Sequence, residues 1–202
     1  MGQHSKQTQR RPRWLAIAAL MVGAFFAGPG QAATFTLSDA VDHHDWQSVT
    51  LSRGDTGGAD QAAGGERHFR AVESVSYSDA TLSVNATPGV CDMPWLEVRV
   101  ALDDKQAEDQ TADIVPAQLR VDAKTLHQSV AEFITERGDD GFYVHFYLND
   151  REGLLNEMRH GKQLFLGFEQ GERDPWYMTF SLDGADDAIG ETLHDCRATR
   201  VL

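Results

Sequence analysis

The sequence lacks the short motifs that identify common enzymes. It contains none of the G-x-S-x-G, S-x-x-K and H-E-x-x-H patterns, which are typical of nucleophilic hydrolases and zinc proteases. Apart from one adjacent pair, its histidines are scattered singly. We therefore expect a non-enzymatic protein without a cofactor. An exported enzyme or ligand-binding protein, with a site assembled from distant residues, is the alternative.

A long apolar run is also missing after residue 33. The run before it, Trp14–Ala27, follows a basic segment and precedes small residues at 30–32. About 14 apolar residues are fewer than the roughly 20 that span a bilayer, which disfavours the alternative of a retained membrane anchor. The pattern predicts a signal peptide at residues 1–33 and bacterial Sec export to the periplasm or the medium.

Cationic side chains are scarce, with 18 Lys and Arg against 31 Asp and Glu and a formal net charge of −13. Such a surface repels the phosphates of nucleic acids and anionic lipids. We therefore expect no nucleic-acid partner, and without a second apolar run we expect no stable membrane insertion. A protein or a component of the cell envelope is the expected partner class, and the oligomeric state stays open.

Only two cysteines are present, Cys91 and Cys196. Two cysteines in an exported chain usually pair. Neither lies in a C-x-x-C motif, and each has an aspartate as a direct neighbour, Asp92 after the first and Asp195 before the second, which raises a thiol pKa. We predict a structural disulfide that closes a loop of about 105 residues and stabilises the fold by about 4–5 kcal/mol in the chain-entropy model.

Alternating apolar residues predict strands over most of the chain, at 46–53, 68–77, 80–86, 95–102, 114–122, 142–148, 162–169 and 176–182. A helix is expected at 151–160, with Gly161 as a left-handed stop, and a second one begins after Asp183 as its cap. The sequence therefore predicts a mainly β fold. We expect an antiparallel β-sandwich or flattened barrel of seven or eight strands with two short helices, the last one C-terminal.

Two segments need separate treatment. Residues 125–136 fit a helical stripe as well as a strand, but the Gly-Asp-Asp-Gly run at 138–141 favours a hairpin. Residues 54–65 contain five glycines and no apolar period, which predicts a mobile loop. With 34–45 as a polar segment leading in, residues 34–202 are expected to form a single β-rich domain.

Two clusters are candidates for binding. His43 and His44 lie between Asp42 and Asp45, and imidazoles with carboxylates suit zinc or copper. A third histidine at suitable spacing is missing nearby, and neighbours on a strand point to opposite faces. A polar lead-in segment is therefore the main interpretation, and a metal-handling protein that uses both histidines is the alternative.

The second cluster is Tyr143, His145 and Tyr147, which alternate with apolar residues and so share one face of a predicted strand. An exposed aromatic row is typical of a binding surface, and coverage by a neighbouring segment is the other possibility. Glu97 and Arg99, also on alternating positions, are interpreted as a solvated face.

The closing segment resembles the invasion-associated locus B family of bacterial exported proteins. The similar features are Gly161 with Leu164, the run Ser181–Gly184, Ala188 and the terminal Cys196. The chain has Ala185 where that family usually has an aromatic residue, and fewer cysteines than is usual there. The resemblance covers about the last 45 residues. It implies a periplasmic protein linked to envelope or host interaction, with no catalytic residues to carry over.

Overall fold

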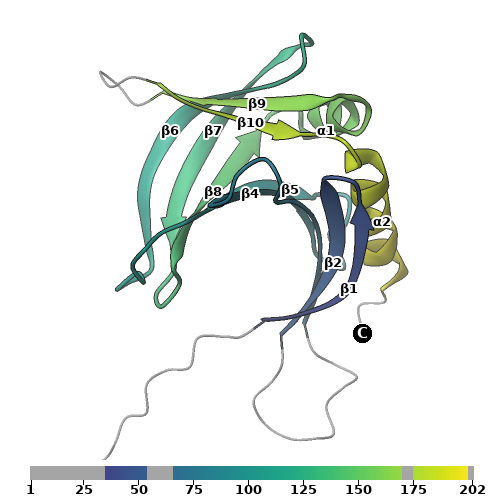
Figure 1. Ribbon diagram of the computed structural model, residues 1–202, viewed down its shortest axis with the longest axis horizontal. Helices are drawn as coiled ribbons and strands as arrows, with labels where there is room; N and C mark the ends of the chain where they lie inside the picture. Colours follow the sequence, from purple (N-terminus) through teal and green to yellow (C-terminus); the bar gives the residue numbers. More distant parts are fainter. Residues whose placement is uncertain (1–34, 54–65, 170–174, 200–202) are drawn as a thin grey trace, which may run out of the picture. The chain divides into compact units, whose positions relative to one another are not determined.

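The structure, a computed structural model, describes residues 35–53, 66–169 and 175–199. The predicted signal peptide at 1–33 and the predicted loop at 54–65 lie outside the described residues. The described strands (Figure 1) are β1 (Phe35–His43), β2 (Trp46–Arg53), β3 (Arg67–Glu73), β4 (Ala80–Ala86), β5 (Trp95–Ala101), β6 (Gln110–Val121), β7 (Leu126–Thr135), β8 (Gly141–Leu148), β9 (Gln163–Phe168) and β10 (Trp176–Ser181). The described helices are α1 (Arg151–His160) and α2 (Ala185–Ala198).

All described strands join one antiparallel sheet in the order β1-β2-β3-β4-β5-β8-β7-β6-β9-β10. The sheet bends strongly, so that β9 and β10 lie above β4 and β5 in Figure 1. Strands β1 and β10 are its two ends and do not pair with each other, so the sheet is not closed into a barrel. The prediction of a mainly β, antiparallel fold with two helices, the second C-terminal, is confirmed.

Strand β1 forms where the sequence suggested only a polar lead-in. It pairs with β2 from Phe35 opposite Arg53 to His43 opposite Trp46, with a bulge between Ser38 and Val41. Nearly all of its side chains are exposed, because it is an end strand. An exposed strand shows no apolar alternation, and the sequence pattern therefore missed it.

Strand β7 settles the ambiguity at residues 125–136 in favour of the hairpin. It pairs with β8 in continuous register, with Thr135 opposite Phe142 and Ser129 opposite Leu148. The apolar residues that suggested a helical stripe separate in the strand, since Leu126 and Val130 are exposed. The Gly-containing turn overrides the weak helical pattern here.

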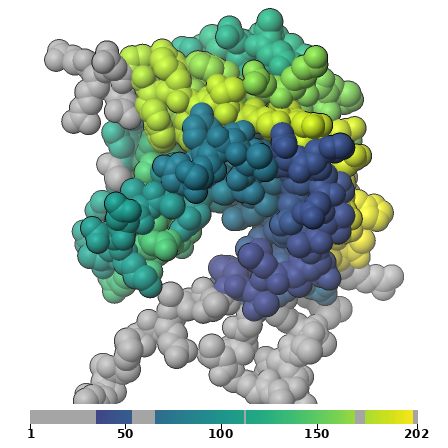
Figure 2. Space-filling model, viewed as in Figure 1, coloured from purple at the N-terminus to yellow at the C-terminus, as the bar shows by residue number. Residues whose placement is uncertain are grey.

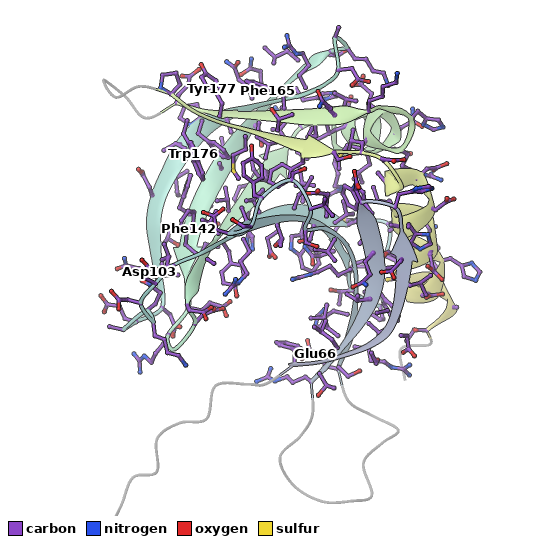
Figure 3. The ribbon with its side chains drawn as sticks, in the orientation of Figure 1. Glu66, Asp103, Phe142, Phe165, Trp176 and Tyr177 are labelled. Atoms are coloured by element: carbon purple, nitrogen blue, oxygen red, sulfur yellow. A yellow bond between two sulfur atoms is a disulfide. The ribbon has the colours of Figure 1, made fainter. Side chains whose placement is uncertain are left out.

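The core lies between the two halves of the bent sheet. Trp176 stacks on Phe168 with ring centroids 5.0 Å apart and lies 6.4 Å from Phe142, which Figure 3 also shows inside the bend. At the other end of the core, Tyr77 meets Phe180 edge-on at 5.2 Å. These aromatic contacts fasten the β9–β10 end of the sheet over the middle strands.

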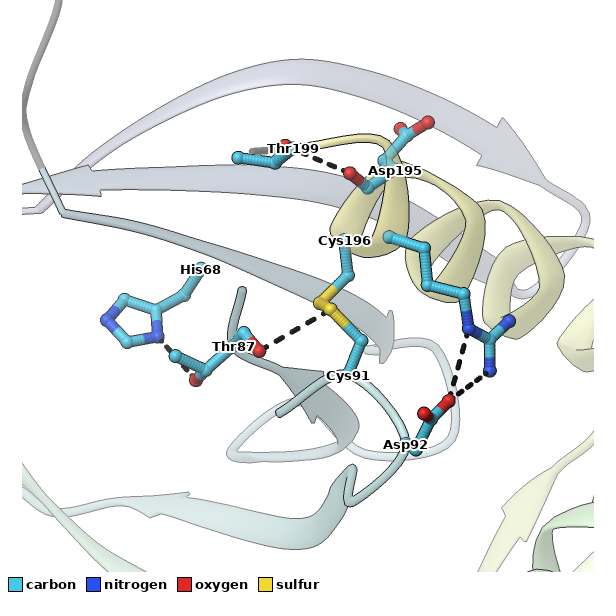
Figure 4. The surroundings of a disulfide bond; sticks show 8 residues. His68, Thr87, Cys91, Asp92, Asp195, Cys196 and Thr199 are labelled. Atoms are coloured by element: carbon cyan, nitrogen blue, oxygen red, sulfur yellow. Dashed lines mark hydrogen bonds and ion pairs between the residues drawn. A yellow bond between two sulfur atoms is a disulfide. The ribbon is translucent and has the colours of Figure 1, made fainter. Parts of the chain in front are cut away.

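Helix α2 packs against β1 to β4, with Ile189 and Cys196 fully buried on the face that the sequence predicts. The Cys91 and Cys196 sulfurs are joined as a disulfide, 2.00 Å apart (Figure 4). Beside it, Arg197 donates hydrogen bonds to the Asp92 carboxylate at 3.1 and 3.3 Å. The disulfide therefore ties the C-terminal helix to the connection between β4 and β5.

Two helix ends differ from the sequence prediction. Gly161, expected in a left-handed conformation after α1, is extended, with φ −95° and ψ −176°. A Cβ there would lie 2.2 Å from Val121, so close packing demands this glycine. Helix α2 is preceded by Gly184 at φ 92° rather than capped by the side chain of Asp183. The Asp183 carbonyl instead accepts a hydrogen bond from the Asp45 amide at 3.1 Å.

Substitution Gly184→Ala is expected to lower the free energy of unfolding by about 2–5 kcal/mol. A left-handed φ costs a residue with a Cβ about 1–2 kcal/mol, and the new Cβ would lie 1.8 Å from the His43 carbonyl oxygen. Overpacking of that kind adds about 1–3 kcal/mol. Gly138→Ala is the matched control, because Gly138 has φ 84° but open space around it. Equal losses in urea unfolding would contradict the packing explanation.

Candidate functional site

A groove of about 800 Å³ crosses the sheet on the face opposite the core. In Figure 2 it is the hollow between β1–β2 and the ends of β6–β8. Phe35 and Leu51 line one side, and Glu136 and Asp139 line the other. Its floor carries side chains from β3, β4, β5 and β8, namely Arg70, Asn85, Trp95, Glu97, Tyr143, His145 and Tyr147.

The alternation of β5 and β8 creates this floor. Leu96 and Val98 of β5 point into the core, so Trp95 and Glu97, which alternate with them, point into the groove. Strand β8 pairs with β5 so that His145 lies directly opposite Glu97. The register of two apolar strands therefore places a carboxylate and an imidazole side by side on the polar face.

Glu97 is the centre of the floor and is only 5% exposed. Arg70 Nη2 donates to its Oε1 at 3.1 Å, and His145 Nε2 lies 3.0 Å from its Oε2. Asn85 accepts from Arg70 Nε at 2.5 Å, which fixes the guanidinium. Burial alone would raise the pKa of Glu97, but the hydrogen bond to His145 and the charge of Arg70 outweigh it and lower the pKa.

The interpretation of Glu97 as part of a solvated face is therefore wrong. Alternation on β5 correctly turned the side chain away from the core, but it did not reveal that neighbouring strands cover it. Arg70 is 27 positions away and His145 is 48 positions away, so no local pattern connects the three. The sequence did contain one signal for this network. Arg70, Glu97 and His145 are ionisable residues that each occupy a position facing away from the core on a different strand.

Tyr143 is held in a compact cluster at the end of β8. Its hydroxyl donates to Asp139, and the Arg99 guanidinium lies 5.9 Å from its ring centroid while donating to Asp139 at 2.8 Å. Burial and the bond to Asp139 raise the pKa of Tyr143 to about 12. Tyr143 therefore stays a neutral phenol that braces the wall of the groove.

Tyr147 is the open member of the predicted row, with 59% of its surface exposed. Its hydroxyl donates to Glu132 of β7, and this bond and a second one from Thr111 lower the pKa of Glu132. The ring is thus oriented by one polar contact and exposes its faces. Tyr143, His145 and Tyr147 all line one groove. They differ in exposure, because Tyr143 is held by Asp139 and Arg99 whereas Tyr147 is largely exposed.

The two candidate metal ligands face different partners. His43 Nε2 lies 2.7 Å from Glu191 Oε2 on α2, and Ser48 donates to the same oxygen at 2.5 Å. His44 is exposed at the hairpin turn, 3.9 Å from Asp183. In the described part of the chain, no group of three or more His, Cys, Asp or Glu has the arrangement of a metal site. His43 therefore has a structural contact that anchors the β1–β2 hairpin on α2.

Fold and groove together define an antiparallel β protein with a polar and aromatic groove on one face of its sheet. No protein-family model matches the chain, and no curated protein matches it. The chain is similar to the crystal structure of invasion associated protein B from Bartonella henselae, with 14% identity, a TM-score of 0.45, and 78% of this chain and 97% of that one covered. This is a distant structural relationship and assigns no activity. None of the described helices is long and apolar enough to span a membrane.

Proposed function

We propose that the chain is an exported, non-enzymatic protein whose groove binds a protein or a component of the cell envelope. The groove carries this proposal, because it combines exposed aromatic surface with a floor whose charges are already paired. Tyr147 offers contact area at low entropic cost. The Glu97 network holds the floor rigid, which reduces the cost of ordering the site on binding.

Two ionisable groups of the groove, Glu97 and Tyr143, support binding over catalysis. A general base works best with a pKa near the operating pH and with an oxygen free to reach the substrate. Glu97 has a lowered pKa and both of its oxygens are occupied, while Tyr143 holds its proton to a pKa of about 12. The second candidate function is a ligand-binding protein or an enzyme whose site is assembled from distant residues. The groove favours it because its lining residues come from strands far apart in the sequence.

Export is supported by the basic and apolar start of the sequence and by the paired cysteines. The resemblance of Ser181–Gly184 and Cys196 to the invasion-associated locus B family, whose members are exported, also supports the proposal of export. N-terminal sequencing of protein from the periplasmic fraction or the medium tests it. A mature chain that begins near residue 34 is the expected result, and a chain that still begins at Met1 would contradict export.

Substitution Tyr147→Ala is expected to reduce recovery of the bound component about tenfold or more, as truncation of an aromatic anchor does. Quantitative mass spectrometry of material that co-purifies with the exported protein measures the effect. Tyr177→Ala is the matched control, because Tyr177 is 56% exposed and lies on β10, outside the groove. Equal recovery with both variants would contradict the groove as the binding site.

A further inference from the structure

One rim of the groove is strongly acidic. We define the acidic rim as residues 103–109 and 136–140, which contain seven Asp or Glu and two Lys or Arg. The two segments lie side by side, because the Gly138 amide donates to the Gln106 carbonyl at 2.9 Å and the Gln106 amide donates to the Asp139 carbonyl at 2.8 Å. In Figure 3, Asp103 of the acidic rim lies on one side of the opening of the bent sheet, and Glu66 lies on the other side.

Glu136 is the acid of this rim that faces the groove without a cation of its own. Asp139 shares the Arg99 guanidinium with Asp140, whereas Glu136 forms no ion pair with any described residue. Glu136 as a whole residue is exposed, but partial desolvation of its carboxyl group, together with the charges of Asp139, Glu97 and Asp109, raises its pKa. Its ionised form is therefore disfavoured in the fold, and a cation in the groove would relieve that cost.

The opposite lip carries apolar residues beside His68, whose ring centroid lies 6.0 Å from that of Phe35. Phe35 is 44% exposed and Leu51 is half-buried, and both line the groove from β1 and β2. Trp95 and Tyr147 also line the groove, and their rings accept both aliphatic chains and cations. A ligand that fills the groove therefore meets apolar surface on one side and unneutralised carboxylate on the other.

From this arrangement we infer that the groove binds an extended segment of a partner protein in which basic and apolar side chains alternate. Lys or Arg side chains lie against Glu136 at the acidic rim, and apolar side chains lie against Phe35 and Leu51. In an extended segment successive side chains point to opposite sides, which matches two unlike walls. The inference rests on the proposed function and names the class of its ligand.

A short capped peptide of alternating lysine and leucine is the probe, titrated into the disulfide-bonded chain at physiological ionic strength. Binding is measured by calorimetry and by Trp95 indole shifts in NMR spectra. We expect Glu136→Gln to weaken binding about five- to tenfold, the loss of one partly screened charge contact. The same variant is expected to unfold at an equal or higher temperature, because the lost charge was repelled by its neighbours. Asp187→Asn, on exposed α2, makes the same charge change away from the groove and should bind like the wild type.

Equal weakening by Glu136→Gln and Asp187→Asn would overturn the inference, because it would mean a general attraction to an acidic surface. Absence of Trp95 shifts with the lysine–leucine peptide would also overturn it. The same NMR titration with a neutral chitooligosaccharide distinguishes two cases: a groove that does not bind basic segments, and a groove that binds no ligand at all. If the sugar alone shifts Trp95, the groove binds ligands but the basic-segment inference is wrong.

Discussion

The double substitution Cys91→Ala/Cys196→Ala is expected to lower the free energy of unfolding by about 4–5 kcal/mol. The disulfide joins residues 105 positions apart, and a loop of that length carries a closure entropy of about this size in the chain-entropy model. The bond also holds α2 against β1 to β4, so its loss should release the C-terminal helix first. For a single domain of ordinary stability this is a large share of the total.

Urea unfolding of the oxidised wild type and the double variant measures the loss. The wild type in reductant should match the variant, which separates the covalent bond from the packing of the two sulfurs. Asp92→Asn is a local control, since the exposed Arg197–Asp92 pair should contribute less than about 1 kcal/mol. A loss of under about 1 kcal/mol in the double variant would contradict the structural role of the bond.

The second large effect is expected for Arg70→Met, which should cost about 3 kcal/mol at neutral pH. The substitution leaves the Glu97 carboxylate buried, with His145 as its remaining ionisable partner. Removing one partner of a buried pair is costly because the other charge stays desolvated. Replacement of both by apolar residues, as Arg70→Met/Glu97→Leu, should recover most of the stability.

The pH dependence of this effect follows from the lowered pKa of Glu97. Its stabilising contribution is present above the pKa of an unfolded glutamate and is lost as the pH falls through the lower folded pKa. In Arg70→Met the carboxyl group protonates more easily, so the deficit relative to the wild type should shrink at about pH 4. Urea unfolding at the two pH values checks this, and a deficit that grows with acidity would contradict the charge-pair account.

Strong alternation made most of the strands predictable from sequence. Strand β8 was expected at 142–148 and runs over 141–148, because its apolar residues form one side of the core. The same alternation placed Tyr143, His145 and Tyr147 on one face. Pattern arguments succeed here because burial against a single core imposes the period on the sequence.

The sequence could not predict what surrounds that face. Glu97 is buried because β3 and β8 bring Arg70 and His145 to it, and this depends on strand order across the sheet. Strand β5 pairs with β8 rather than with the next strand in the chain, so the groove joins residues that no local spacing relates. The end strand β1 escaped notice for the opposite reason, since it buries almost nothing.

Site-directed photo-crosslinking in the producing cells tests the groove as a binding site most directly. A benzoylphenylalanine is introduced at Tyr147 in the groove or, as the control, at Tyr177 on β10. We predict a discrete adduct from position 147 that is absent from position 177 and weaker in the Glu136→Gln background. No adduct at position 147, or the same adduct from both positions, would contradict the assignment of the groove as the binding site.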